Sequence, residues 1–198
     1  MGAISLRGIL NGEKVSKFRE LGLLVFIVIL SVAVQLRNPS FMTVDNISDM
    51  LRNTVILTIL ALGMMLVIIT RGIDLSIGST LALSGMITAL TVYALPDLNP
   101  FVVIVLGILT GLVCGSIVGL LVSKTGVLPI IASLGMMNIF RGLTFMVSGG
   151  RWVSAHQMPD SFKSIATGST LGVNNMLLLL AFILVVFYYF VNYKGVNC

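Results

Sequence analysis

The most informative group of polar residues lies in the segment Arg71-Gly-Ile-Asp-Leu-Ser-Ile-Gly-Ser79, between two long apolar runs. Arg71 and Asp74 carry opposite charges three residues apart, so they can share one helix face or close a tight turn. In a structural interpretation, Asp74 pairs with Arg71 and caps the following helix, whose dipole favours a carboxylate at its start. Gly72 then permits the turn, and Gly78 permits a close approach of another backbone.

A functional interpretation of the same segment is also open. Asp74 and Ser76 would then lie at a broken helix inside a membrane, where they line a path or transmit movement. A charge at that depth costs ~2.5–3.5 kcal/mol on insertion scales. The depth of Asp74 therefore distinguishes the two interpretations.

A second polar pair, Asn138 and Arg141, lies inside another apolar run. The spacing of three residues places both side chains on one face of a helix. They either bond a neighbouring helix or reach toward the headgroups, or they line a hydrated cavity. Four residues are thus candidates for a substrate path: Asp74, Ser76, Asn138 and Arg141.

The sequence shows no recognisable catalytic or metal-binding pattern. His156 is the single histidine and has no second ligand residue near it, so we expect a solvated loop residue. Arg151 and Trp152, close by, are typical of an anchor at a membrane interface. Cys114 and Cys198 form no disulfide framework and no metal-ligand pair. Since Walker A, nucleophile-elbow and zinc-protease motifs are also missing, we expect no catalytic residue and no metal site.

The composition of the chain indicates what kind of structure carries these residues. Of 198 residues, 57% are hydrophobic and 10% are charged, and the mean hydropathy is +1.09. Soluble domains carry about a quarter charged residues, so an ordinary soluble enzyme and a disordered regulator are excluded. The net charge of +5 does not indicate a nucleic-acid-binding domain, because the twelve Lys and Arg residues form no patch or stripe.

Six apolar runs approach or reach the ~20 residues that a helix needs to cross a bilayer. We predict an all-α, polytopic membrane helix bundle with about six transmembrane helices. Residues 1–20 would form a cytoplasmic N-terminal segment, 21–191 the transmembrane domain, and 192–198 a short cytoplasmic tail. The predicted spans are Leu21–Leu36, Thr54–Thr70, Ile73–Leu95, Phe101–Val122, Leu128–Ser148 and Met176–Val191.

The Lys and Arg residues orient the chain. With the N-terminus in the cytoplasm, that side carries seven of them and the opposite side four, which favours cytoplasmic N- and C-termini by the positive-inside rule. The long polar connection Gly149–Asn175 then faces outward. The seven are Arg7, Lys14, Lys17, Arg19, Arg71, Lys124 and Lys194, and the four are Arg37, Arg52, Arg151 and Lys163.

Glycines recur every four residues in the run Phe101–Val122. This pattern lets another helix approach at backbone distance, although glycine is also frequent in membrane helices generally. We expect close packing against a helix of this chain or of another copy, without a chemical role. The glycines are Gly107, Gly111, Gly115 and Gly119.

Several longer stretches carry a family resemblance. They are Asn38–Thr54, Ala61–Ser79 with its I-D-L-S-I-G core, Gly111–Leu143 with L-P-I-I-A-S-L-G-M-M, and Ser148–Ser154. In these stretches the chain resembles the membrane-spanning permease subunit of bacterial ABC importers for ribose, xylose, rhamnose and autoinducer-2. The resemblance extends over roughly Asn38 to Tyr193.

Two features depart from the family pattern. Members more often have glycine at the position of Arg71, although an arginine variant occurs, so the substrate subgroup stays open. Members also continue to roughly ten spans, through a cytoplasmic Gly-Arg-led stretch that ends in an A-x-G-x-N-type motif. This chain instead reads Asn192-Tyr-Lys-Gly-Val-Asn-Cys198. We therefore expect the incomplete N-terminal part of such a permease, produced by truncation or a frameshift.

The resemblance implies an energy-coupled importer in the bacterial plasma (inner) membrane. A sugar-binding protein would deliver substrate outside, and two permease subunits, as a homo- or heterodimer, would form the path through the lipid bilayer. A cytoplasmic ABC ATPase would use the ATP, so this chain would bind no cofactor and no nucleic acid. Two alternatives are a branched-chain amino-acid ABC permease and a non-transporting membrane scaffold protein.

Overall fold

The computed structural model describes residues 6–170 and 172–195, with side chains over 21–170 and 172–192. The chain divides into two compact units, residues 1–51 and residues 52–198. The outer parts of the predicted terminal segments, residues 1–5 and 196–198 with Cys198, lie outside the described residues. The cytoplasmic placement of both segments stays a prediction.

The first unit contains α1 (Leu6–Arg37), a 3-10 turn (Pro39–Met42) and the start of α2. The Gln35 side chain fixes the turn, because its amide nitrogen donates to the Pro39 carbonyl at 3.2 Å and its amide oxygen accepts from the Met42 N–H at 2.9 Å. The apolar part of α1, Leu21–Arg37, corresponds to the predicted first span.

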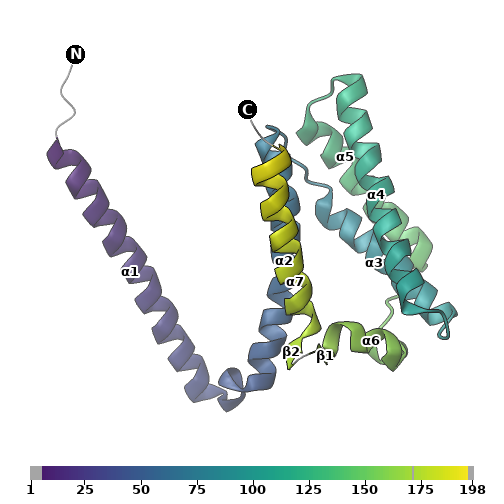
Figure 1. The fold of residues 1–198 in the computed structure, drawn as a ribbon, viewed down its shortest axis with the longest axis horizontal. Coiled ribbons are helices and arrows are strands. Elements are labelled where there is room, and N and C mark those ends of the chain that lie inside the picture. The colour runs from purple at the N-terminus through teal and green to yellow at the C-terminus, as the bar shows by residue number, and fades with distance from the viewer. Residues whose placement is uncertain (1–5, 171, 196–198) are drawn as a thin grey trace. The chain divides into compact units, whose positions relative to one another are not determined.

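The second unit contains the rest of α2 (Val44–Ile69) and the more C-terminal helices and strands (Figure 1). The connection predicted as one long polar loop includes a 3-10 turn (Ala155–Gln157), a short helix and an antiparallel strand pair, β1 with β2. The elements are α3 (Ile77–Ala94), α4 (Pro100–Thr125), α5 (Pro129–Ser148), α6 (Asp160–Thr167), β1 (Ser169–Thr170), β2 (Val173–Asn174), α7 (Asn175–Tyr189) and a π turn (Phe190–Gly195).

Five of the described helices are long and apolar enough to cross a membrane: α2, α3, α4, α5 and the segment Asn175–Asn192 that begins with α7. The all-α, polytopic bundle is confirmed. Most large apolar side chains on these helices are exposed, and the second unit's core is correspondingly small. An apolar outer surface of this extent fits hydrocarbon rather than water.

The core of the second unit lies among α3, α4 and α5, which Figure 1 shows packed together. At its centre Phe140 is 2% exposed. A polar bond accompanies the apolar contacts, because the Ser84 hydroxyl of α3 donates to the Gly107 carbonyl of α4 at 2.9 Å. The buried residues that form this cluster are Leu83, Cys114, Val118, Met136 and Phe140.

The helix boundaries depart from the prediction at several places, including the starts of α1, α2 and α3. The third span was predicted to start at Ile73, but α3 starts at Ile77, because residues 71–76 form an irregular connection. The second span was predicted to start at Thr54, but α2 begins at Val44. Its first turns are polar, so hydropathy does not reveal them, although their backbone is helical.

The glycines of α4 differ in what surrounds them. A Cβ on Gly107 would lie 3.0 Å from Thr88 Cγ2 and 3.5 Å from Ser84 Oγ. At Gly111, Gly115 and Gly119 a Cβ would meet nothing within 4 Å in the described chain. Close packing is therefore seen at Gly107, and the packing role of the other three stays a prediction.

Replacing Gly107 by alanine should destabilise the second unit by about 1–3 kcal/mol, the range for overpacking. Thr88 cannot easily yield, because its hydroxyl already donates to backbone carbonyls at 3.0 Å and 2.9 Å and its χ1 is restricted. Gly111→Ala is the matched control and should be neutral or slightly stabilising, since alanine favours helix. SDS-titrated unfolding in mixed micelles measures both, and equal stabilities would contradict the contact.

Candidate functional site

The irregular connection between α2 and α3 begins with a helix-ending turn. The Arg71 N–H donates to the Ile68 carbonyl at 2.9 Å, and the Gly72 N–H donates to the Val67 carbonyl at 3.0 Å. These two bonds define a Schellman motif, in which the residue after the helix takes the left-handed conformation usually given to glycine. Here that residue is Arg71, with φ +60°.

Gly72 has little room for a side chain. A Cβ at this position would lie 3.2 Å from Val67 Cγ1, 3.4 Å from the Val67 carbonyl oxygen and 3.9 Å from Pro129 Cβ. The connection therefore runs tightly past the end of α2 and the first turn of α5. By contrast, nothing lies within 4 Å of a Cβ on Gly78, so no close backbone approach is seen there among the described residues.

Asp74 acts within the connection rather than as the cap of α3. One carboxylate oxygen accepts the Ser76 N–H at 2.7 Å and the Ser76 hydroxyl at 2.6 Å. Ser76 itself occupies the N-cap position, without a side-chain cap bond. The expected cap by Asp74 is thus wrong in position, by two residues.

The expected ion pair between Arg71 and Asp74 is also wrong, since no such pair within 4.0 Å occurs between these two described residues. The physical reason is that each residue has another structural role. Arg71 closes α2 in the left-handed conformation, and Asp74 satisfies the polar groups of Ser76. Asp74 therefore forms local hydrogen bonds with Ser76 in place of the ion pair with Arg71 that the sequence spacing suggested.

Two serines that sequence reasoning missed hold the connection in place. Ser133, fully buried on α5, donates to the Ile73 carbonyl at 3.2 Å and shares its hydroxyl with its own helix at 3.3 Å. Ser79 donates to the Ser76 carbonyl at 2.7 Å. A small polar residue inside an apolar run was the available signal, because its hydroxyl needs a partner when it is buried.

The candidate path residues do not form one cluster. Ser76 is 1% exposed and Asp74 is half-buried, both within the connection. Asn138 and Arg141 lie further along α5, on its exposed face. The Asn138 amide donates to the Leu134 carbonyl of its own helix at 3.0 Å, and no bond of either residue to the α2–α3 connection occurs within the described chain. The predicted path role of these residues stays a prediction.

Trp152 and His156, also singled out from the sequence, follow the C-terminal end of α5, whereas the α2–α3 connection contacts its first turns. Trp152 is 84% exposed in the irregular stretch after α5, and His156 is exposed in the 3-10 turn that follows. Among the residues searched, no three His, Cys, Asp or Glu side chains gather as metal ligands would.

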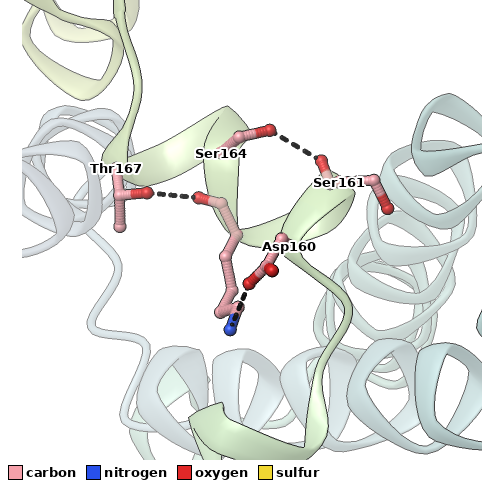
Figure 2. Close-up of polar contacts among 5 residues, drawn as sticks. Asp160, Ser161, Ser164 and Thr167 are labelled. Carbon is pink, nitrogen blue, oxygen red and sulfur yellow. Dashed lines mark hydrogen bonds and ion pairs between the residues drawn. The ribbon is translucent and has the colours of Figure 1, made fainter.

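Several polar contacts lie within the short helix α6 (Figure 2). Lys163 pairs with Asp160 at 2.7 Å, and this hydrogen bond and charge lower the pKa of the Asp160 carboxyl. Within the helix, the Ser164 hydroxyl donates to the Ser161 carbonyl at 2.9 Å, and the Thr167 hydroxyl donates to the Lys163 carbonyl at 3.0 Å. Because Asp160 is exposed and Lys163 is only half-buried, the pair contributes little to the stability of the fold.

The left-handed Arg71 predicts a difference between two substitutions. Glycine adopts this conformation freely, whereas alanine keeps the strain, and neither carries the charge that favours a helix C-terminus. Arg71→Gly should therefore be more stable than Arg71→Ala by about 1 kcal/mol. The free energy of unfolding in mixed micelles measures this, and equal values would show that the turn is unstrained.

Comparison with known proteins places the chain among transport permeases. The sequence model of a family described as the permease component of branched-chain amino acid transport systems matches residues 46–196. The ribose import permease protein RbsC of Haemophilus influenzae is 38% identical over 167 residues, which cover 83% of this chain and 51% of that protein. No solved structure matches the chain.

Two further relatives give the same result. The ribose import permease protein RbsC of Bacillus subtilis is 37% identical over 155 residues, which cover 78% of this chain and 48% of that protein. The autoinducer 2 import system permease protein LsrC of Enterobacter sp. is 30% identical over 173 residues, with 86% and 48% covered. The chain thus spans about half the length of the curated relatives it matches.

These similarities confirm the resemblance to ribose and autoinducer-2 import permeases. They agree with the five apolar helices, which make the protein a multi-pass membrane protein. Because the family match covers most of the chain, this protein belongs to the family of permease components of branched-chain amino acid transport systems.

Proposed function

We propose that this chain is part of the membrane-spanning permease subunit of an ATP-driven ABC importer for a simple sugar or a related polyol. The observation that carries the proposal is the 38% identity to a ribose import permease along 83% of this chain. The apolar helices supply a bilayer-spanning frame, and the polar α2–α3 connection joins two of them.

The partners follow from this function. A second permease subunit would complete the path, a cytoplasmic ABC ATPase would hydrolyse ATP, and an extracytoplasmic sugar-binding protein would deliver substrate. The distribution of Lys and Arg supports a cytoplasmic N-terminus in the bacterial plasma membrane. The end of α2 and the start of α3 then face the cytoplasm, and Trp152 faces outward.

The candidate residues divide into two roles. The Ser76 hydroxyl already donates a hydrogen bond to the Asp74 carboxylate, and Ser76 is buried. We therefore assign both residues to positioning the α2–α3 connection. Asn138 and Arg141 are exposed on α5, and Arg141 makes no hydrogen bond or ion pair within the described part of the chain. In a complete importer, these two side chains would donate hydrogen bonds to substrate hydroxyls in a hydrated passage.

Two other functions are weighed against this one. The family description names branched-chain amino acids, whereas the relatives cited above are named for ribose and autoinducer-2, which favours the sugar-type substrate. A scaffold without transport would need no polar residues on an exposed membrane face. Arg141 on such a face is costly unless it is covered or hydrated.

A chimera tests the proposal directly. This chain would replace the aligned half of the Haemophilus influenzae ribose import permease, in cells that depend on that permease for ribose uptake. We expect uptake of labelled ribose and no competition by leucine. Competition by leucine would favour the amino-acid alternative, and a membrane-inserted chimera without uptake would contradict the proposal.

Variants of a working chimera test the two roles. Asn138→Ala and Arg141→Gln should reduce ribose uptake at low substrate concentration about tenfold, the effect of losing one or two hydrogen bonds to substrate. Asp74→Ala should lower the amount of folded protein in the membrane as well as uptake. Tyr188→Phe, at an exposed position on α7, is the control. Normal uptake in the Asn138 and Arg141 variants at normal protein levels would remove both from the path.

A further inference from the structure

The end of α5 opposite the α2–α3 connection carries two hollows that the proposed path does not use. One has a volume of about 550 Å³ and the other about 290 Å³. Both are lined by Ser148, Arg151, Trp152 and Val153, so the Trp152 side chain borders both. The larger volume lies within the range of small-molecule sites, about 300–1,000 Å³.

A rigid turn presents Trp152 at this place. Gly149 and Gly150 are both left-handed, with φ +57° and +72°, and end α5 with a Schellman motif. The Ser148 hydroxyl oxygen accepts the Gly150 N–H at 3.2 Å and donates to the Phe145 carbonyl at 3.2 Å. The stretch that carries Trp152 is thus tied to the last turn of α5.

The larger hollow combines aromatic faces with hydrogen-bond donors. Tyr93, from the last turn of α3, contributes a second aromatic ring and a hydroxyl. Gln157 contributes an amide whose oxygen is already used, because it accepts the Ser154 N–H at 2.8 Å. Its amide nitrogen makes no hydrogen bond within the described chain and is free to donate. Arg151 adds the planar donors of a guanidinium.

The lining of both hollows also lacks any acidic side chain. A neutral polyol has C–H faces that pack on aromatic rings and hydroxyl oxygens that accept hydrogen bonds. Aromatic rings beside unused donors match that chemistry. An interfacial anchor would account for an exposed tryptophan, but not for two hollows or for the free donors around it.

We propose that the hollows beside Trp152 form an entry subsite, in which a neutral polyol stacks on Trp152 and is bound through Arg151, Tyr93 and Gln157. This proposal rests on the proposed function, which supplies the substrate class and the outward orientation. The subsite would hold the substrate at the outer end of α3 and α5 before it enters the membrane-spanning path.

The chain itself provides the probe, since Trp152 is its single tryptophan. The 198-residue chain would be placed in lipid nanodiscs and titrated with ribose, ribose 5-phosphate or leucine, while Trp152 emission is recorded. We expect a saturable change with ribose and none with leucine. Arg151→Gln and Tyr93→Phe should each raise the apparent Kd about tenfold, the loss expected for one strong hydrogen bond. Tyr188→Phe, a substitution of an exposed tyrosine on α7, is the control.

A second set of nanodiscs, made with brominated phosphatidylcholine, tests the lipid alternative. Strong quenching of Trp152 that ribose does not relieve would identify an anchor in the membrane and overturn the proposal. Tighter binding of ribose 5-phosphate than of ribose would also overturn it, because the site would then select an anion. Ribose uptake by the chimera without any ribose effect on Trp152 would refute this subsite and leave the proposed function intact.

Discussion

The central constraint on this structure is the need to satisfy every backbone polar group where the helical ladder breaks between α2 and α3. Backbone groups that leave the helical ladder need other partners where they are buried, and the chain supplies several of them. It does so with the Schellman bonds of Arg71 and Gly72, with Asp74 bound to Ser76, and with the Ser133 hydroxyl bound to the Ile73 carbonyl. These bonds hold the connection between α2 and α3 in place.

Two hydrogen bonds of this kind join neighbouring elements of the second unit. Ser133 joins the connection to the first turns of α5, and the Ser84–Gly107 bond joins α3 to α4. Phe140 lies in the small core among these three helices. With so little buried apolar surface, a few polar bonds carry much of the specificity of packing, as small polar residues do in membrane bundles.

Particular residues show how far sequence reasoning reached. The segment from Arg71 to Ser79 was singled out between two predicted spans, and an irregular connection between two helices lies there. The hydrogen bonds within it were not predicted. The spacing of these residues fits an ion pair between Arg71 and Asp74 as well as it fits hydrogen bonds between Asp74 and Ser76, so it does not decide between them. The glycine repeat likewise predicted an approach of helices, but only geometry shows contact at Gly107 and open space at the next three positions.

The sequence by itself determined the all-α membrane class, the approximate spans and the family, because long apolar runs in a bilayer have few alternatives to helix and because the motifs are contiguous. The tertiary structure decided the partners: Ser133 with Ile73, sixty residues away, and Tyr93 with Trp152 around one hollow. Such pairings depend on how the helices pack, and a one-dimensional pattern of hydropathy does not contain that information.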